Sequence, residues 1–466
     1  AEVREHAGGC TVELGGGLSL CLTALELDII RVALRPPGNC ERLRRTWMVA
    51  PGMDSLPEEG RDKESTEGFQ MVPTTLERTE DGMLRLSTGL LRVTLPLALG
   101  APLCLRFSWF DERTGEWRLL MQDRPTGAYY FDSSDGRAQH YISRRRGDAF
   151  YGCGERSGPL DLTGRRIDMR CVDAMGYNAA SSDPLYKHWP FYIRKAVVVE
   201  IDSSDSAAKV EPLGPAAHGV PPGLCSSNSG GAAYGVFYDS MVRATFDFGA
   251  ELNNYHGLFT SYQAECGCDL DYYVILGPSI RTVTGRFSWL TGRTLLPPRW
   301  SLGYSGSTMA FTDAPDAHAQ LLGFLADCEK HGIPCSSFQL SSGYSSDPSK
   351  GGKRYVFEWN RSKVPDPAAL ASAFEAAGIR LAANLKPCLL TDHPQYESCA
   401  RQRLFVQRSG AAAAMEAHAA HGGAVFWPSG TSRGVWAPEL SMFWDARGSH
   451  LDFTNPDTSA WWRNRV

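Results

Sequence analysis

The sequence predicts a β-sandwich over residues 1–297, followed over residues 298–466 by a unit in which strands and helices alternate around a parallel sheet. Three observations lead to this. A chain of 466 residues is too long for one hydrophobic core. Short apolar runs separated by Gly, Pro, Asp and Asn recur through the first part, which is typical of sandwiches. After Pro297-Pro298, strand-like and helix-like runs alternate, which implies parallel strands joined by right-handed crossovers.

The first part contains seven runs with the composition of β-strands. Each is rich in Val, Ile, Leu, Thr, Tyr or Phe and is bounded by turn-forming residues. Two polar stretches, 51–68 and 202–232, interrupt the pattern and predict surface loops. The predicted strands are residues 18–25, 29–34, 84–95, 103–110, 196–201, 235–238 and 272–276.

In the second part, helical periodicity alternates with short strands. Leu321, Leu322 and Leu325 mark one face of a predicted helix, and Gly378 suits the left-handed position that ends another. A run of alanines after the third strand predicts a helical insertion. In chain order the elements are strand 302–306, helix 314–331, strand 337–340, helix 367–377, strand 379–385 and helix 411–423.

Composition excludes several classes of function. The net charge is −5, and no basic cluster suggests a nucleic-acid surface. No stretch approaches the ~20 apolar residues of a membrane span, and the N-terminus lacks the apolar region of a signal peptide. Thirteen cysteines are an odd number without metal-site spacing, so we expect no disulfide framework, no metal and no cofactor. Reduced thiols slightly favour the cytoplasm, while the compartment and the oligomeric state stay open.

Three long motifs carry a family resemblance. They are YGCGERSGPLDLTGRRIDMRCVDAMGYNAASSDPLYKHWPFYI from Tyr151, DLDYYVILGPSI from Asp269 and LTGRTLLPPRWSLGY from Leu290. In these motifs the chain resembles glycoside hydrolase family 31, the α-glucosidase family. The resemblance implies a β-sandwich with a substrate-side loop near residues 155–190, followed by an incomplete (β/α)8 TIM barrel whose C-terminal face holds the site.

The resemblance also implies the chemistry. Family members are retaining enzymes with a carboxylate nucleophile and a carboxylic general acid/base, through which a covalent glycosyl-enzyme forms and is hydrolysed. The final segment, LDFTNPDTSAWW, is similar to the family sequence just before the fourth barrel strand. We therefore expect both catalytic carboxylates beyond Val466, assign neither role to any residue here, and expect the chain by itself to be inactive.

Two candidate substrate contacts lie in matched motifs. Asp173, in CVDAMGYN, falls in the loop that the family sends over the barrel mouth, where a carboxylate can accept hydrogen bonds from sugar hydroxyls. A turn aspartate that caps its own backbone is the structural alternative. Tyr304 is predicted to end the first barrel strand and to offer a sugar an apolar platform, the alternative being a core tyrosine.

At two places the chain departs from the common family pattern. Ser341 and Ser342 stand in LSSGY, where most α-glucosidases of the family carry Asp-Ile-Asp-Tyr. Lys386 stands before Pro387, where Asp-Pro is common. The serines leave the sugar specificity open among glucose, galactose and xylose. Lys386 is predicted either to orient a carboxylate or sugar hydroxyl or to form an ion pair at the rim.

The Trp444-Asp445 pair falls where the family places a tryptophan against the sugar face, and both residues are candidate substrate contacts. A core tryptophan is the alternative. Asp366 and Asp452 each precede a helix or turn, so we expect them to cap free backbone N–H groups.

The leading hypothesis for the function is a retaining α-glycosidase that removes terminal α-linked glucose or galactose from oligosaccharides or glycoconjugates. A transglycosylase would share the covalent intermediate but would pass the sugar to another sugar. A non-catalytic carbohydrate-binding chain would keep only Asp173, Tyr304 and Trp444 as a partial site. All three imply an oligosaccharide or glycoside ligand and no nucleic acid or membrane partner.

Overall fold

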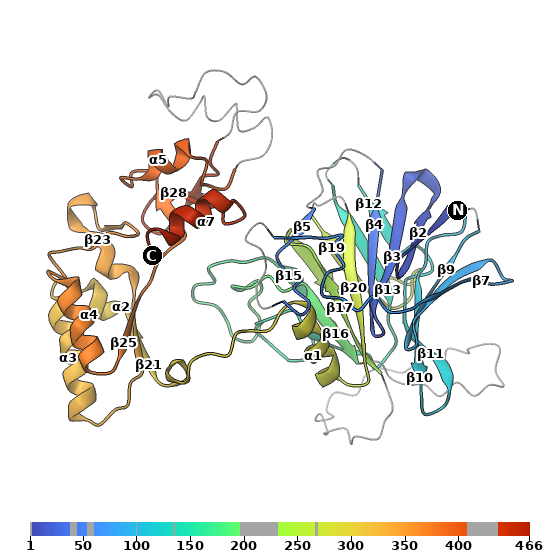
Figure 1. Cartoon of the computed structure of the whole chain (residues 1–466), viewed down its shortest axis with the longest axis horizontal. Coiled ribbons are helices and arrows are strands. Elements are labelled where there is room, and N and C mark those ends of the chain that lie inside the picture. Colours follow the sequence, from blue (N-terminus) through green and yellow to red (C-terminus); the bar gives the residue numbers. More distant parts are fainter. Residues whose placement is uncertain are drawn as a thin grey trace. The chain divides into compact units, whose positions relative to one another are not determined.

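A computed structural model describes residues 2–37, 44–53, 60–98, 100–132, 134, 136–195, 232–265, 269–407 and 437–466 (Figure 1). The chain divides into two compact units. The first consists of Ala1–Leu56 with Arg61–Arg293, and the second of Pro57–Gly60 with Thr294–Val466. We call them the N-terminal unit and the C-terminal unit.

The N-terminal unit is built from antiparallel strands in three main sheets. The largest has the order β1-β2-β3-β4-β20-β17-β16-β14, so β4 lies beside β20 although about 240 residues separate them. Its strands are β1 (Glu2–His6), β2 (Gly9–Glu13), β3 (Ser19–Glu26), β4 (Ile29–Arg35), β14 (Ala149–Gly152), β16 (Phe191–Lys195), β17 (Ala233–Tyr238) and β20 (Leu270–Gly277).

Two five-stranded sheets and one small ribbon complete this unit. One sheet holds β7 (Thr75–Arg78), β8 (Met83–Ser87), β9 (Leu91–Pro96), β10 (Arg106–Asp111) and β11 (Glu116–Gln122). The other holds β12 (Tyr129–Phe131), β13 (Ala138–Ser143), β15 (Arg166–Met169), β18 (Ala244–Asp247) and β19 (Phe259–Ala264), and the ribbon pairs β5 (Arg45–Thr46) with β6 (Arg61–Asp62). The predicted sandwich of many short strands is thus present.

The predicted strand 84–95 was wrong, because these residues form the hairpin of β8 and β9 rather than a single strand. The Thr88 hydroxyl accepts hydrogen bonds from the backbone N–H groups of Leu90 and Leu91 and thereby fixes a turn. A Ser-Thr-Gly break in an apolar run is an ordinary turn signal.

The largest sheet buries both of its faces. On β4 the side chains of Ile30, Val32 and Leu34 enter the main core, whereas Ile29 belongs to a second core on the opposite face. Helix α1 (Ile280–Leu290) covers that second core, and its Phe287 ring stacks on another phenylalanine ring with centroids 3.7 Å apart. The Ser279 hydroxyl caps α1 by accepting from the backbone N–H of Thr282.

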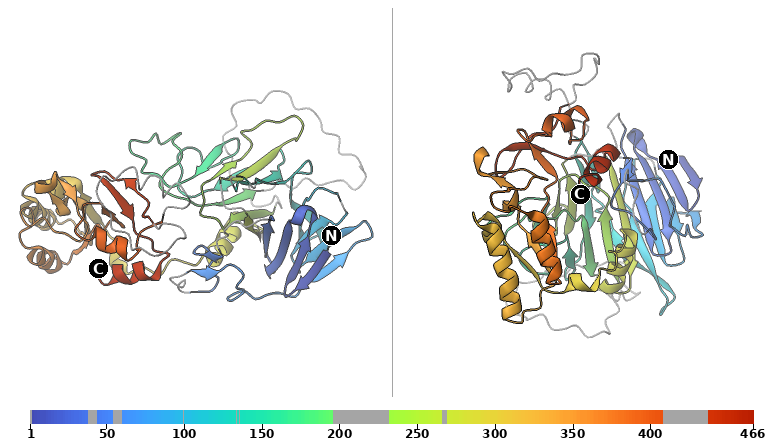
Figure 2. Two further views of the ribbon diagram at one scale, coloured as in Figure 1. Left: turned by 90° about the horizontal axis from the view of Figure 1, so that it is seen from above. Right: turned by 60° about the vertical axis from the view of Figure 1, so that its left-hand side comes forward.

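The C-terminal unit begins with three parallel strands in the order β21-β22-β25 (Figure 2). Helices α3 and α4 match the predicted helices to within a few residues, β22 coincides with its prediction, and Gly378 has the expected positive φ of 72°. The carboxylates of Asp366 and Asp452 cap backbone N–H groups, as predicted. The elements are β21 (Ser305–Thr308), α2 (Met309–Asp313), α3 (Ala317–Lys330), β22 (Ser337–Leu340), α4 (Pro367–Ala376) and β25 (Arg380–Ala383).

Smaller elements follow the parallel strands. Three short strands, β26 (Cys388–Leu390), β27 (Ser441–Met442) and β28 (Arg447–His450), pair antiparallel. They are accompanied by α5 (Tyr396–Arg401) and α7 (Pro456–Arg463), and the ribbon of β23 (Ser346–Asp347) and β24 (Lys353–Arg354) lies between β22 and α4 in the chain. The predicted strand 196–201 and the predicted helix 411–423 lie outside the described residues.

Within the described ranges, no helix has both the length and the apolar character needed to cross a membrane.

Candidate functional site

Polar residues gather where the parallel strands of the C-terminal unit end. The register pairs Thr308 with Leu340 and Leu340 with Ala383, so the three strands finish at one edge of the sheet. The segments that follow directly carry Ser342 and Lys386. Sites of parallel α/β folds form at this edge, because the loops there converge.

A small hollow at this edge brings together four of the predicted site residues: Ser342, Lys386, Trp444 and Asp445. They come from three separate segments of the chain. Seven residues that sequence analysis did not select also line the hollow: Ser345, Arg354, Val356, Asn384, Cys388, Leu390 and Phe443.

The Lys386 side chain brings a positive charge into this hollow. Its Nζ lies 5.3 Å from the centroid of the Trp444 ring, within the range of a cation–π contact. No carboxylate of the described residues lies within 4.0 Å of Lys386, so the rim ion pair that the sequence left open is not formed with any of them. The Trp444 side chain is 56% exposed, which excludes the alternative of a core tryptophan.

Arg354 holds the carboxylate of Asp445 through two hydrogen bonds. Its Oδ1 accepts a hydrogen bond from Arg354 Nη1 at 2.8 Å, and its Oδ2 accepts from the Arg354 backbone N–H at 3.0 Å. The same guanidinium reaches Asp313 Oδ1 at 3.4 Å. Two carboxylates therefore compensate Arg354, and Lys386 is left as the cation without a carboxylate partner in the described part of the hollow.

The loop that carries the two serines is firmly anchored. Ser341 precedes the 3-10 helix Ser342–Ser345, and the hydroxyl of Tyr344 in this helix donates to the backbone oxygen of Asn384 at 3.0 Å. A Cβ at Gly343 would lie 2.1 Å from Asp313 Oδ1, so only glycine fits there. The ring of Trp359 packs on Tyr344 with centroids 4.5 Å apart.

The Lys363 ammonium also anchors this loop through hydrogen bonds. Its Nζ donates to the backbone oxygen of Gly343 at 3.3 Å and to the Ser346 hydroxyl at 2.9 Å. Burial lowers the pKa of this ammonium. The positions of Ser341 and Ser342 thus depend on fixed backbone rather than on a mobile loop.

The hollow offers no thiol nucleophile, because burial raises the pKa of Cys388 to about 11 and the thiol stays protonated at neutral pH. Nor do the described residues contain a group of three or more His, Cys, Asp or Glu side chains placed to hold a metal ion.

The prediction that Tyr304 ends the first barrel strand was wrong. Residues 299–302 form a 3-10 helix, so β21 starts only at Ser305 and Tyr304 lies just before the strand rather than at its end. Its backbone oxygen accepts from the N–H of Ser336, which precedes β22. Tyr304 therefore lies at the N-terminal edge of the sheet, opposite the edge that carries Ser342 and Lys386.

Asp173 belongs to the N-terminal unit, in the described loop between β15 and β16. It is exposed, and its carboxylate together with burial raises the pKa of Tyr186. Its role as a substrate contact stays a prediction, as do the roles of Ser341, Ser342, Lys386, Trp444 and Asp445.

Among the residues that sequence analysis missed, Asn384 had a usable signal. It follows β25 directly and stands two positions before Lys386, so a search for polar residues at the end of this strand would have found it. Arg354 had none, since it occurs in a GGKRY turn whose return to the strand ends depends on the ribbon of β23 and β24.

Comparison with known proteins agrees with this fold. Residues 19–197 match the N-terminal galactose mutarotase-like domain of glycosyl hydrolase 31, and residues 294–466 match the TIM-barrel domain of glycosyl hydrolases family 31. The chain belongs to glycoside hydrolase family 31.

Curated relatives and solved structures extend the comparison. The α-xylosidase XylQ of Lactiplantibacillus pentosus is 24% identical over 84% of this chain, and α-glucosidase 2 of Bacillus thermoamyloliquefaciens is 28% identical over 53%. The chain spans 41% and 25% of these relatives. A family 31 dextranase of Flavobacterium johnsoniae, solved with glucose, shares the fold over all of this chain and 45% of its own, with a TM-score of 0.71 and 18% identity.

Proposed function

We propose that this chain contributes the sugar-binding edge of a retaining α-glycosidase that releases a terminal α-linked sugar from an oligosaccharide or glycoconjugate. One observation carries the proposal: Lys386, which has no carboxylate partner among the described residues, and the exposed Trp444 lie together at the C-terminal ends of the parallel strands. Family membership and the names of the α-xylosidase and α-glucosidase relatives support an α-linkage.

The side chains of the hollow have complementary roles in this proposal. The exposed ring of Trp444 stacks on the C–H face of a pyranose. Lys386 donates hydrogen bonds to ring hydroxyls, and Ser342 and Asn384 supply neutral donors and acceptors. The Arg354–Asp445 ion pair forms a fixed part of the wall of the hollow. Because Arg354 neutralises Asp445, little negative charge is left there to bind a cation.

The chemistry that the family implies is double displacement. A carboxylate attacks the anomeric carbon while a carboxylic acid protonates the leaving oxygen, and water then releases the sugar from the covalent glycosyl-enzyme. We assign neither carboxylate to a residue of this chain. The residues described here bind and orient the sugar for that attack.

Sugar binding by the 466-residue chain tests the proposal directly. Methyl α-D-glucoside, methyl α-D-galactoside and methyl α-D-xyloside are titrated while tryptophan fluorescence and saturation-transfer NMR are recorded. We expect saturable binding of at least one glycoside and loss of its fluorescence response in Trp444→Phe. If none of the three glycosides binds, the proposed sugar site is wrong.

Lys386→Met is expected to weaken the binding of the preferred glycoside about tenfold, because a hydrogen bond from a charged donor contributes about 1.5–3 kcal/mol. Methionine keeps the length of the side chain and much of its contact with the Trp444 ring. Lys330→Met, in an exposed lysine at the end of α3, is the control and should leave the affinity unchanged. Equal affinities of both variants and the wild type would remove Lys386 from the site.

Ser341→Asp is expected to raise the ratio of glucoside to galactoside affinity about five- to tenfold, because it restores a carboxylate at a position where most α-glucosidases of the family have one. Ser336→Asp, at the opposite end of β22, is the control. Isothermal titration with both methyl glycosides gives the ratio. An unchanged ratio in Ser341→Asp would show that this position does not select the sugar.

A further inference from the structure

A second hollow, of about 210 Å³, lies in the N-terminal unit and has no part in the proposed sugar site. It opens on the face of the largest sheet opposite the main core, between strands β2, β3 and β4 and the two stretches Thr46–Val49 and Arg61–Phe69. Its polar lining follows from strand alternation. On β3, Leu20 and Leu22 enter the main core, whereas Cys21 and Thr23 point to the hollow.

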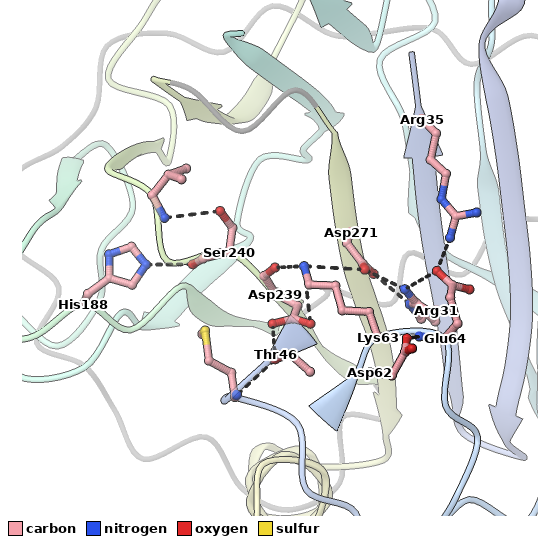
Figure 3. Close-up of polar contacts among 12 residues, drawn as sticks. Arg31, Arg35, Thr46, Asp62, Lys63, Glu64, His188, Asp239, Ser240 and Asp271 are labelled. Atoms are coloured by element: carbon pink, nitrogen blue, oxygen red, sulfur yellow. Dashed lines mark hydrogen bonds and ion pairs between the residues drawn. The ribbon is translucent and has the colours of Figure 1, made fainter. Parts of the chain in front are cut away.

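Most of the charge that lines this hollow is positive. Four basic side chains line it, Arg31, Arg35, Arg61 and Lys63, against the single carboxylate of Glu64. Figure 3 shows a continuous series of contacts that begins at Asp239 and passes through Lys63, Asp271, Arg31 and Glu64 to Arg35.

One edge of the Arg31 guanidinium is held by an ion pair, and its other edge has no acceptor among the described residues. Its Nε and Nη2 donate to the two carboxylate oxygens of Asp271 at 2.8 and 2.7 Å, and the residue is only 7% exposed. No acceptor among the described residues lies within hydrogen-bonding distance of its Nη1. A buried ion pair therefore holds a guanidinium whose remaining N–H groups are still available.

Arg61 has no carboxylate partner at all in the described part of the chain. It is 4% exposed, and its Nη2 donates to the backbone oxygens of Ser65 and Glu67, both at 2.7 Å. Its Nη1 is buried without a hydrogen-bond partner, and burial lowers the pKa of this guanidinium. A buried cation without an anion costs several kcal/mol, and a bound anion would offset that cost.

Arg35 stands at the mouth of the hollow. Its side chain is 31% exposed, and Nη2 donates to Glu64 Oε1, while Nε and Nη1 have no acceptor among the described residues. The hydroxyls of Thr11, Thr23 and Thr66 add neutral donors around the same space.

We propose that this hollow binds a small oxyanion, with the phosphate group as its ligand chemistry. Fixed guanidinium forks match the oxygen geometry of phosphate, and buried arginines lose little conformational entropy on binding it. The same chemistry is presented by free inorganic phosphate and by the phosphate of a phosphorylated sugar, and the volume admits either the ion with waters or the ion with part of a sugar ring.

The test uses the 466-residue chain and two probes, inorganic phosphate and glucose 6-phosphate, titrated by calorimetry at constant ionic strength with chloride as the balancing anion. We expect saturable binding, weakened about five- to tenfold by Arg35→Gln. Glucose without phosphate should not compete. Tighter binding of glucose 6-phosphate than of phosphate assigns the site to a sugar phosphate, and equal binding assigns it to the free ion.

Arg85→Gln is the matched control. Arg85 pairs with Glu77 on the neighbouring strand, and the side-chain exposures of this pair, 32% and 55%, nearly equal the 31% and 58% of Arg35 and Glu64. It lies outside the hollow, so its variant should bind phosphate like the wild type. Absence of saturable binding of both probes, or equal weakening in the two variants, overturns the proposal. Inorganic phosphate carries no sugar, so its binding is independent of the proposed glycosidase function, and the titration with glucose 6-phosphate is made in saturating methyl α-D-glucoside to keep the proposed sugar site occupied.

Discussion

Asp271→Ala is expected to lower the free energy of unfolding of the N-terminal unit by about 3–5 kcal/mol, because it leaves Arg31 buried without its carboxylate. Burial alone would lower the pKa of Arg31, but the Asp271 carboxylate outweighs it and raises that pKa well above its ordinary value. The pair joins the two central strands β4 and β20, so its loss weakens the middle of the largest sheet. Hydrogen exchange of the β4 and β20 amides measures the change.

Two further variants test whether the cost of Asp271→Ala comes from leaving the Arg31 charge unpaired or from removing a buried side chain. Asp111→Ala removes a buried carboxylate, 1% exposed, whose partners Arg113 and Arg118 are 66% and 27% exposed against 8% for Arg31, so its cost should be smaller. The double variant Arg31→Met/Asp271→Leu should recover most of the lost stability, since apolar replacements of a buried pair are often neutral or stabilising. A loss below about 1 kcal/mol in Asp271→Ala would show that Arg31 reaches another anion or water.

Asp239→Asn is expected to stabilise the N-terminal unit at neutral pH by about 1–3 kcal/mol. Asp239 is 3% exposed, and burial raises its pKa from the ordinary 3.8 to about 6, despite the opposing charge of Lys63. A difference of that size corresponds to about 3 kcal/mol at most. Asparagine still accepts the hydrogen bond that the Thr46 hydroxyl donates at 2.6 Å.

The sign of the pH dependence distinguishes this effect from ordinary acid denaturation. Because the pKa of Asp239 is higher in the folded state, its contribution to stability is fully present below about pH 4 and is lost as the pH rises through about 6. Asp271 has the opposite sign, since Arg31 overcomes burial and lowers its pKa. The difference between Asp239→Asn and wild type should therefore be small at pH 4 and grow towards pH 7. A difference that does not change with pH would refute the assignment.

Strand alternation made much of the N-terminal fold predictable. The run LSLCLTAL alternates clearly and became β3, and the apolar run after it became β4. Helix α1 was missed because Thr, Val and Gly285 weaken its helical propensity, although Val283, Phe287 and Leu290 have the spacing of one helical face.

The candidate site was predictable only where the family motifs cover it. Ser342, Lys386, Trp444 and Asp445 were found in this way, and Tyr304 was misplaced because a strand boundary moved by a few residues. Arg354 depends on a ribbon pairing, and the Arg31–Asp271 pair joins positions 240 residues apart, a separation that no local pattern reveals.

The neighbouring positions of β4 and β20 also constrain how the protein is made. At synthesis rates of 5–20 residues per second, roughly 10–50 s pass between the emergence of these two strands from the ribosome. During that interval the apolar edge of β4, with the sequence IIRVALR, has no partner on the side that β20 later occupies. The N-terminal unit therefore cannot complete its largest sheet until β20 has emerged, and until then the nascent chain exposes an unpaired strand edge to chaperones and to other nascent copies.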